Sequence, residues 1–240
     1  MIGIIGGAGV AATNKLNELI EIDLTKNGAF RDFHHPEIII WQATQVPSRS
    51  MYLEGNGDSF INEYVKIASS LKSLGCRKIC MCCNTAHYAI NEISNKSHVD
   101  FIDLIKEVVL EAKNTNLNKI GVIASNGCLQ GKVYEKYFKE YYPKATIIYP
   151  NKEEQKLVTL GICNIKNKYR FLSDDAQINN IHQRPRKIFS NVVNALKKRG
   201  AEIVIIGCTD IRVDYFEVNN IDSLEVLKKA IIKEVNEKRY

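Results

Sequence analysis

The chain has 240 residues, of which 45% are hydrophobic and 25% are charged, and its formal net charge is +6. These values are typical of a globular protein. No apolar run approaches the roughly 20 residues of a membrane helix, which excludes a membrane-spanning protein. The length suits either one large α/β unit or two compact halves.

The distribution of charge and the use of cysteine further limit the classes of protein that fit this sequence. The basic stretches 184–187 and 197–199 carry no interleaved stacking aromatics, which favours solvated helix faces over nucleic-acid binding. Residues 1–7 have neither a basic segment nor a small-residue cleavage site, so we expect a cytoplasmic protein. The seven cysteines, an odd number, fit a reducing compartment. The cysteine-rich run 80–83 alternates in face and no second pair follows it, so no metal site is expected.

Short apolar runs rich in β-branched residues alternate with helix-period segments along the whole chain. Strands are predicted at 1–5, 37–41, 77–82, 100–102, 119–124, 145–149 and 202–207. Helices are predicted at 15–23, 58–74, 85–95, 103–115, 129–141, 151–168, 185–199 and 222–238. This alternation is typical of βαβ units and a mainly parallel sheet. The polar stretch 164–184 is predicted to be a surface excursion between helices.

Two cysteines each follow a predicted strand and open a polar turn. Cys83 begins the segment Cys-Asn-Thr-Ala-His (83–87), and Cys208 begins Cys-Thr-Asp (208–210). A thiol at the carboxyl end of a strand faces the start of the next helix, where unpaired backbone N–H groups and the helix dipole stabilise a thiolate. Two such thiols would flank a small molecule, one removing a proton from carbon and the other delivering a proton to the opposite face. We therefore expect inversion of a stereocentre.

The two cysteine segments resemble the catalytic signatures of the aspartate/glutamate racemase superfamily, whose members racemise amino acids without pyridoxal phosphate. Weaker similarities occur at 6–13, 46–50 and 165–166, in the same order as in the family. The resemblance implies a racemase that needs no cofactor, acts on a small-molecule amino acid and forms a homodimer.

The resemblance also implies the fold, which is α/β with two similar Rossmann-like lobes, mainly parallel sheets and an active site in the cleft between them. The N-terminal lobe is expected to comprise 1–103 and 209–240 and to carry Cys83. The second lobe is expected to comprise 104–208, with Cys208 at its edge.

The same resemblance assigns roles to individual side chains. Cys83 and Cys208 are the expected catalytic residues, and Asp210 is expected to tune a cysteine. The expected substrate-binding residues are polar, basic or thiol side chains: Thr13, Ser48, Arg49, Asn84, Thr85, Ser125, Cys128, Lys166 and Thr209. Arg49 and Lys166 would bind a distal carboxylate, which implies aspartate or glutamate as the substrate. Taken singly, each of these cations also fits an ordinary exposed loop or helix face.

The chain departs from the family pattern at several positions. Ala8 and Val10 replace the usual Met and Pro of the opening loop, and Asp210 replaces the usual Glu. Ser48 stands where the family often has Asp. The segment 125–128, Ser-Asn-Gly-Cys, replaces a Thr-x-Gly-Thr turn and brings a third cysteine near the cleft. Both catalytic cysteines are retained, so the expected reaction type is unchanged, but the choice among aspartate, glutamate and a broader range stays open.

Three alternative functions are compatible with parts of the sequence. Another isomerase of the superfamily would act on a small acid or a hydantoin, although a neutral ring needs no second carboxylate clamp. A dinucleotide-dependent oxidoreductase is suggested by residues 7–12, which formally match G-x-G-x-x-A after a strand, but the second strand leads into Gln42-Ala43-Thr44 and lacks the usual ribose-binding acid. A non-catalytic binding module is disfavoured because both cysteines are retained.

Overall fold

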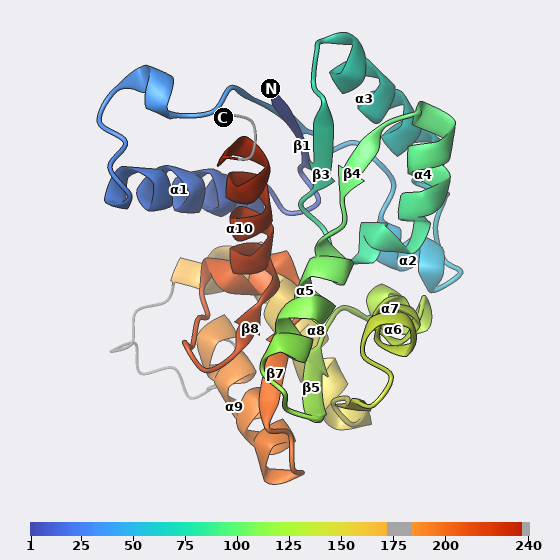
Figure 1. The fold of residues 1–240 in the computed structure, drawn as a ribbon. Helices are drawn as coiled ribbons and strands as arrows, with labels where there is room; N and C mark the ends of the chain where they lie inside the picture. The colour runs from blue at the N-terminus through green and yellow to red at the C-terminus, as the bar shows by residue number, and fades with distance from the viewer. Residues whose placement is uncertain (172–183, 237–240) are drawn as a thin grey trace.

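The structure, a computed structural model, describes residues 1–171 and 184–236. The first half of the chain forms a parallel sheet of four strands in the order β2-β1-β3-β4 (Figure 1). Its strands are β1 (Ile2–Gly6), β2 (Ile38–Gln42), β3 (Lys78–Met81) and β4 (Asp100–Ile102). β1 is buried on both faces, which explains its continuous apolar sequence.

The second sheet repeats this topology in the order β6-β5-β7-β8, again with parallel neighbours. Its strands are β5 (Lys119–Ile123), β6 (Thr146–Ile148), β7 (Ile203–Ile206) and β8 (Ile221–Asp222). In each sheet the third strand in chain order, β3 or β7, lies beside the first. The predicted α/β fold of two similar lobes is confirmed.

Helices flank both sheets (Figure 1). They are α1 (Val10–Lys26), α2 (Arg49–Leu53), α3 (Ile61–Ser73), α4 (Ile90–Ser97), α5 (Leu104–Asn114), α6 (Asn126–Gln130), α7 (Val133–Tyr141), α8 (Lys152–Ile165), α9 (Pro185–Lys198) and α10 (Ser223–Asn236). Short 3₁₀ helices are η1 (Asp32–His34), η2 (Thr85–Ala89), η3 (Lys168–Phe171) and η5 (Thr209–Val213). Every predicted strand and helix overlaps an observed element. The short α2 and β8 were not predicted.

Local sequence explains where several helices begin. The Asp103 side chain accepts a hydrogen bond from the Lys106 backbone N–H and caps α5. Asn151 and Glu154 form a capping box at the start of α8. Pro185 occupies the first turn of α9, where its missing N–H costs no helical hydrogen bond. These caps place the helix boundaries close to the predicted ones.

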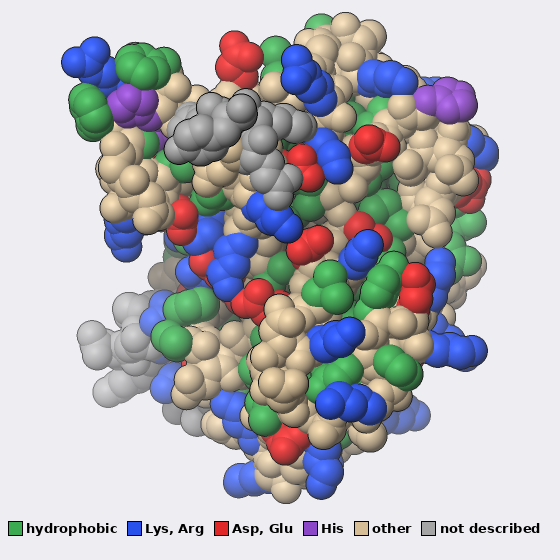
Figure 2. Space-filling view, in the orientation of Figure 1, with side chains coloured by type: hydrophobic (Ala, Val, Ile, Leu, Met, Phe, Trp, Pro, Cys, Tyr) green, Lys and Arg blue, Asp and Glu red, His purple; other side chains and the backbone are tan. Residues whose placement is uncertain are grey.

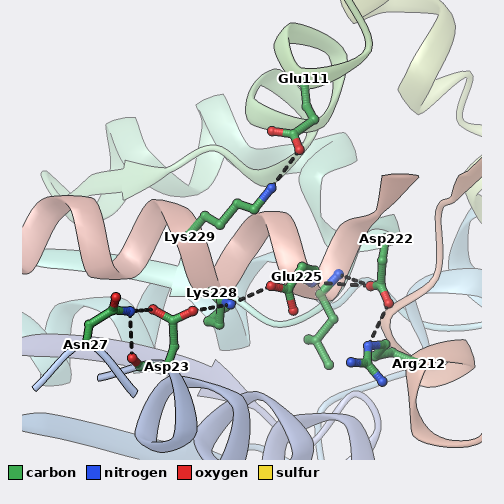
Figure 3. Close-up of polar contacts among 9 residues, drawn as sticks. Asp23, Asn27, Glu111, Arg212, Asp222, Glu225, Lys228 and Lys229 are labelled. Carbon is green, nitrogen blue, oxygen red and sulfur yellow. Dashed lines mark hydrogen bonds and ion pairs between the residues drawn. The ribbon is translucent and has the colours of Figure 1, made fainter. Parts of the chain in front are cut away.

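The carboxyl-terminal region contacts both lobes. β8 pairs with β7 in the second sheet, whereas α10 packs against α1 and α5. Figure 3 shows ion pairs that α10 makes with its neighbours: Lys228 Nζ lies 2.7 Å from Asp23 Oδ1 on α1, and Lys229 Nζ lies 2.7 Å from Glu111 Oε1 on α5. The predicted assignment of 209–240 to the N-terminal lobe therefore covers a segment that joins the lobes, and the domain division stays a prediction.

Figure 2 shows basic and acidic side chains interspersed over this face, so the net positive charge is not gathered there into one patch. None of the helices within the described residues has the length and apolar character that crossing a bilayer requires. Of the predicted surface excursion at 164–184, residues 172–183 lie outside the described part of the chain. Asn164 and Arg184, at its two ends, are buried.

Candidate active site

One cavity of about 110 Å³ contains both predicted catalytic cysteines. Segments of both lobes line it: Ala8, Ser48, Arg49, Ser50, Cys83, Asn84, Thr85, Ser125, Ile162, Lys166, Cys208, Thr209 and Asp210. The cavity is therefore built from the turns that follow the central strands of the two sheets.

The two cysteines occupy corresponding places in the two lobes. Cys83 follows β3 and leads into η2, and Cys208 follows β7 and begins η5. Both following helices begin as 3₁₀ helices of five residues. η2 runs directly into α4, within the helix predicted at 85–95, whereas η5 ends at Val213. The backbone N–H of Asp210 hydrogen-bonds to the Cys208 sulfur.

Arg49 is the charged neighbour of Cys83. Its guanidinium interacts electrostatically with the Cys83 side chain. It also donates to the carbonyl oxygens of Pro47 (3.2 Å) and Ala8 (3.4 Å). Burial, the largest single influence, opposes the charge on Arg49, but the attractions to Cys83, Tyr64 and Asp210 together outweigh it and raise the Arg49 pKa above its ordinary value. Arg49 therefore places a positive charge near the Cys83 side chain.

Cys208 lies in the opposite electrostatic environment. Burial, together with the nearby Asp210 carboxylate, raises the pKa of the Cys208 thiol to about 12. Lys166 and the Asp210 backbone N–H act in the other direction without cancelling these effects. Cys208 is therefore a protonated thiol at neutral pH.

Lys166 and Asp210 form an ion pair at the edge of the cavity. Lys166 Nζ lies 3.0 Å from Asp210 Oδ2 and donates to the carbonyl oxygen of Ala8 at 3.2 Å. Burial raises the Asp210 pKa, and attraction to Lys166 and Arg49 limits this shift. Asp210 Oδ1 is buried and has no hydrogen-bond partner among the described residues.

Hydrogen bonds across the cleft hold the cysteine turns. The Asn84 amide donates to Ser223 Oγ (3.0 Å), and the Asn84 carbonyl oxygen accepts from Tyr134 Oη (2.7 Å). Thr209 Oγ1 donates to the carbonyl oxygen of Cys82 at 3.2 Å, so the turn after β7 is tied to the end of β3.

A second set of contacts joins the other side of the cavity. Thr85 Oγ1 and Ser125 Oγ are 2.9 Å apart, and the Gly127 backbone N–H donates to Ser50 Oγ at 2.9 Å. These bonds connect η2 and α2 of the first lobe with the start of α6 in the second. The two lobes therefore meet in a defined register around the cavity.

Two predicted site residues do not line the cavity. Thr13 is buried, accepts a hydrogen bond from the Gly7 backbone N–H and donates to the Gly9 carbonyl oxygen, both at 3.1 Å. It shapes the loop before α1. Cys128 is buried, and its backbone N–H donates to Ser125 Oγ at 3.3 Å. Burial raises the pKa of the Cys128 thiol well above its ordinary value.

His87, which follows the first cysteine in sequence, has a positioning role. Its Nε2 accepts a hydrogen bond from the Leu104 backbone N–H at 3.2 Å, so the proton lies on Nδ1, which donates to the Cys83 carbonyl oxygen at 2.8 Å. Burial lowers the His87 pKa. His87 is therefore a neutral ring that holds the Cys83 turn against α5.

Sequence reasoning missed several side chains of the site. Ser50 and Ile162 line the cavity, and Tyr134 and Ser223 hold Asn84 from behind. Tyr134 and Ser223 lie on α7 and at the start of α10, about 50 and 140 residues along the chain from Asn84, in positions where a helical pattern indicates only burial. No local signal in the sequence identifies them.

Gly7 and Gly9, the two glycines of the G-x-G-x-x-A match, allow close packing of the loop before α1. Gly7 has φ +81°, and a Cβ there would lie 2.6 Å from the Ala43 backbone nitrogen. A Cβ on Gly9 would lie 1.7 Å from Asp210 Oδ1. The loop therefore needs glycine to approach β2 on one side and the Cys208 turn on the other.

Comparison with known proteins identifies the class. The sequence profile described as Asp/Glu/Hydantoin racemase matches residues 2–227. Together with the two-lobed fold, this match defines the protein as an amino-acid racemase, which is an isomerase. The chain belongs to the Asp/Glu/hydantoin racemase family.

Individual relatives are similar along nearly the whole chain. The broad specificity amino-acid racemase RacX of Bacillus subtilis (strain 168) is 23% identical over 237 residues, which are 97% of this chain and 96% of RacX. Picrophilus torridus aspartate racemase has a TM-score of 0.80 at 24% identity, over 98% of this chain and 94% of its own. Glutamate racemase isoform RacE1 from Bacillus anthracis has a TM-score of 0.68 at 19% identity, over 99% of this chain and 82% of its own. At these identities the structural likeness establishes the fold.

Proposed function

We propose that this protein racemises aspartate or glutamate without a cofactor, and that Cys83 and Cys208 transfer protons on opposite faces of the α-carbon. The observation that carries the proposal is the shared cavity of about 110 Å³, which one cysteine from each lobe lines. The similar proteins include one named as an aspartate racemase and one named as a glutamate racemase.

The proposed reaction begins with Cys83 as thiolate and Cys208 as thiol. Cys83 removes the proton from the α-carbon, and the electrons of the broken C–H bond delocalise into the α-carboxylate. Cys208 then gives its proton to the opposite face, forming a new C–H bond and leaving Cys208 as thiolate. The charges around the two sulfurs support this order, because the Arg49 cation lies near Cys83 whereas the Asp210 carboxylate lies near Cys208.

Hydroxyl and amide groups around the cavity would stabilise the carbanion. Thr85, Ser125 and Ser48 line the cavity, and their hydroxyls can donate to a carboxylate that gains charge during proton removal. Asn84 is held at both ends of its amide, so its position is set before substrate binds. Such preorganised donors lower the free energy of the transition state relative to that in water.

Two cations support an acidic substrate. Arg49 and Lys166 both line the cavity, and a side-chain carboxylate suits a guanidinium fork and an ammonium group. Lys166 is already paired with Asp210, so a bound carboxylate would share it. Asp210 would in this way adjust both the strength of substrate binding and the proton affinity of Cys208.

The test is α-hydrogen exchange by the purified protein in deuterated water without added cofactor. With L-aspartate or L-glutamate we expect deuterium at the α-carbon together with the opposite enantiomer, resolved by chiral chromatography. Cys83→Ser and Cys208→Ser should each abolish racemisation, because a serine hydroxyl is a far weaker acid than a thiol. Cys163→Ser, at an exposed cysteine that does not line the cavity, is the matched control and should keep full activity.

Near-normal turnover in either single variant at the cavity would show the two-thiol assignment to be wrong. A substrate panel that includes alanine, lysine and a 5-substituted hydantoin distinguishes the alternatives. Exchange of the hydantoin without exchange of either acid would replace the proposed substrate while keeping the isomerase class.

A further inference from the structure

A second, larger cavity adjoins the cysteine cavity. Its volume is about 530 Å³, and we call it the outer cavity. Both cavities are lined by Ala8, Lys166 and Asp210, so these residues form the shared wall. The rest of the lining comes from the loop before α1 and its first turns, from Thr44, and from the end of α8 with η3.

Of the two charged side chains in the shared wall, that of Lys166 is the more exposed. Asp210 has only 7% of its side chain exposed, whereas Lys166 has 47% exposed and is held by two contacts, to Asp210 and to the Ala8 carbonyl oxygen. Lys166 stands at the carboxyl-terminal end of α8, as its C-cap residue. Movement of its side chain would change the wall between the two cavities.

The chemistry of the outer cavity suits a flexible chain that ends in an anion. Its ionisable lining groups are Lys166, Arg170 and Asp210, which sum to one positive charge. Asp210 is paired with Lys166, and Arg170 makes no ion pair within the described residues, although its guanidinium lies over the Phe171 ring, 4.4 Å from the centroid. Apolar side chains of Val10, Ala11, Ile165 and Phe171 provide surface for methylene groups.

The proposed substrate orientation points into this space. If Lys166 binds the distal carboxylate, the side chain of the substrate ends at the shared wall, and a longer side chain continues past Lys166. We propose that the outer cavity is a subsite for amino acids whose terminal carboxylate lies beyond that of glutamate, of the 2-aminoadipate class, with Arg170 as its carboxylate partner. This inference rests on the proposed function, since it needs the α-carbon to lie between Cys83 and Cys208.

The experiment compares kcat/KM for α-hydrogen exchange of aspartate, glutamate and 2-aminoadipate. The wild-type protein should exchange all three. Arg170→Gln should lower kcat/KM for 2-aminoadipate by about tenfold or more, the scale of a lost charge-assisted hydrogen bond, and change aspartate less than about twofold. Arg31→Gln, at an exposed arginine near η1, is the matched control and should change neither substrate.

A second variant tests the space without removing charge. Ala11→Leu fills the outer cavity from the first turn of α1, where leucine is a good helix former. It should lower kcat/KM for 2-aminoadipate selectively. If the wild-type protein exchanges aspartate but not 2-aminoadipate, or if both variants affect the two substrates equally, the subsite is rejected and the outer cavity is only a path to solvent. Absence of exchange with every acid would reject the proposed function itself.

Discussion

At the scale of single residues, the two thiols differ because their charged neighbours differ. Cys83 lies near the guanidinium of Arg49, while Cys208 is buried beside the carboxylate of Asp210. A cation favours a thiolate and an anion disfavours it. These neighbours support the proposed roles of Cys83 as the base and Cys208 as the acid.

This asymmetry predicts the order of chemical modification. Iodoacetamide near pH 7 should alkylate Cys83 and leave Cys208 unmodified, because the raised Cys208 pKa of about 12 means that its thiolate forms only in strongly alkaline solution. Arg49→Leu should slow Cys83 alkylation by about tenfold, because the cation near the sulfur is lost. Peptide mapping by mass spectrometry measures both rates, with exposed Cys163 as the internal reference. Preferential labelling of Cys208 would contradict the assignment.

At the scale of elements, the carboxyl ends of β3 and β7 present the cysteines, and α7 braces them. Tyr134 on α7 donates its hydroxyl to Asn84, the residue after Cys83. Its ring also lies against Gly207, the residue before Cys208, where a Cβ would come within 2.8 Å of Tyr134 Cε2. The buried Tyr134 side chain thus contacts Asn84 and Gly207, the residues that adjoin the two cysteines in sequence.

We predict that Tyr134→Phe lowers kcat by about tenfold while changing KM little, since the Asn84 side chain loses its fixed orientation. The same change should lower the free energy of unfolding by about 1–3 kcal/mol, because a buried acceptor is left without its donor. Tyr137→Phe on the next turn is the control: its hydroxyl donates to Asp103 Oδ2 at 2.6 Å, away from the cavity. The Tyr137→Phe variant should lose stability but keep kcat. If Tyr134→Phe and Tyr137→Phe lowered kcat equally, Tyr134 would contribute only to packing and would not position Asn84.

At the scale of the whole molecule, α10 connects the lobes that form the cavity. Lys228 on α10 reaches Asp23 on α1 and also contacts Glu225, and Asp222 at the start of α10 pairs with Arg212 of η5 at 2.9 Å (Figure 3). Asp222 also accepts hydrogen bonds from the first backbone N–H groups of α10. A helix anchored in this way sets the position of one lobe against the other.

The neighbouring residues Lys228 and Lys229 allow a direct test of whether the contacts of α10 stabilise the arrangement of the two lobes. Lys228 has 9% of its side chain exposed, whereas Lys229 has 54% exposed and pairs with a single glutamate. Lys228→Met should lower the free energy of unfolding by about 1–2 kcal/mol, because Asp23 and Glu225 then lack their shared cation. Lys229→Met should cost less than about 0.5 kcal/mol, as expected for an exposed ion pair. Urea denaturation measures both, and equal effects would argue against a coupling role for Lys228.

Local patterns in the sequence were sufficient for the elements and for the two cysteines. Apolar runs such as 203–206 form strands because burial on both faces of a parallel sheet requires continuous apolar sequence, and turn residues mark where such strands end. The short β8 escaped prediction because two paired residues produce no periodicity. The partners of Asn84 escaped it because they depend on packing between distant helices.

The sequence by itself determined the alternation of strands and helices, the places of Cys83 and Cys208 after β3 and β7, and the presence of Arg49 and Lys166. These are local properties, since propensity, periodicity and turn chemistry act over a few residues. Only the tertiary structure decided that both cysteines share one cavity, that Arg49 lies beside Cys83, and that Lys166 is paired with Asp210 at the wall of the outer cavity. Charges and sulfurs from different lobes interact through space, and the distances between them are set by how the two sheets pack together.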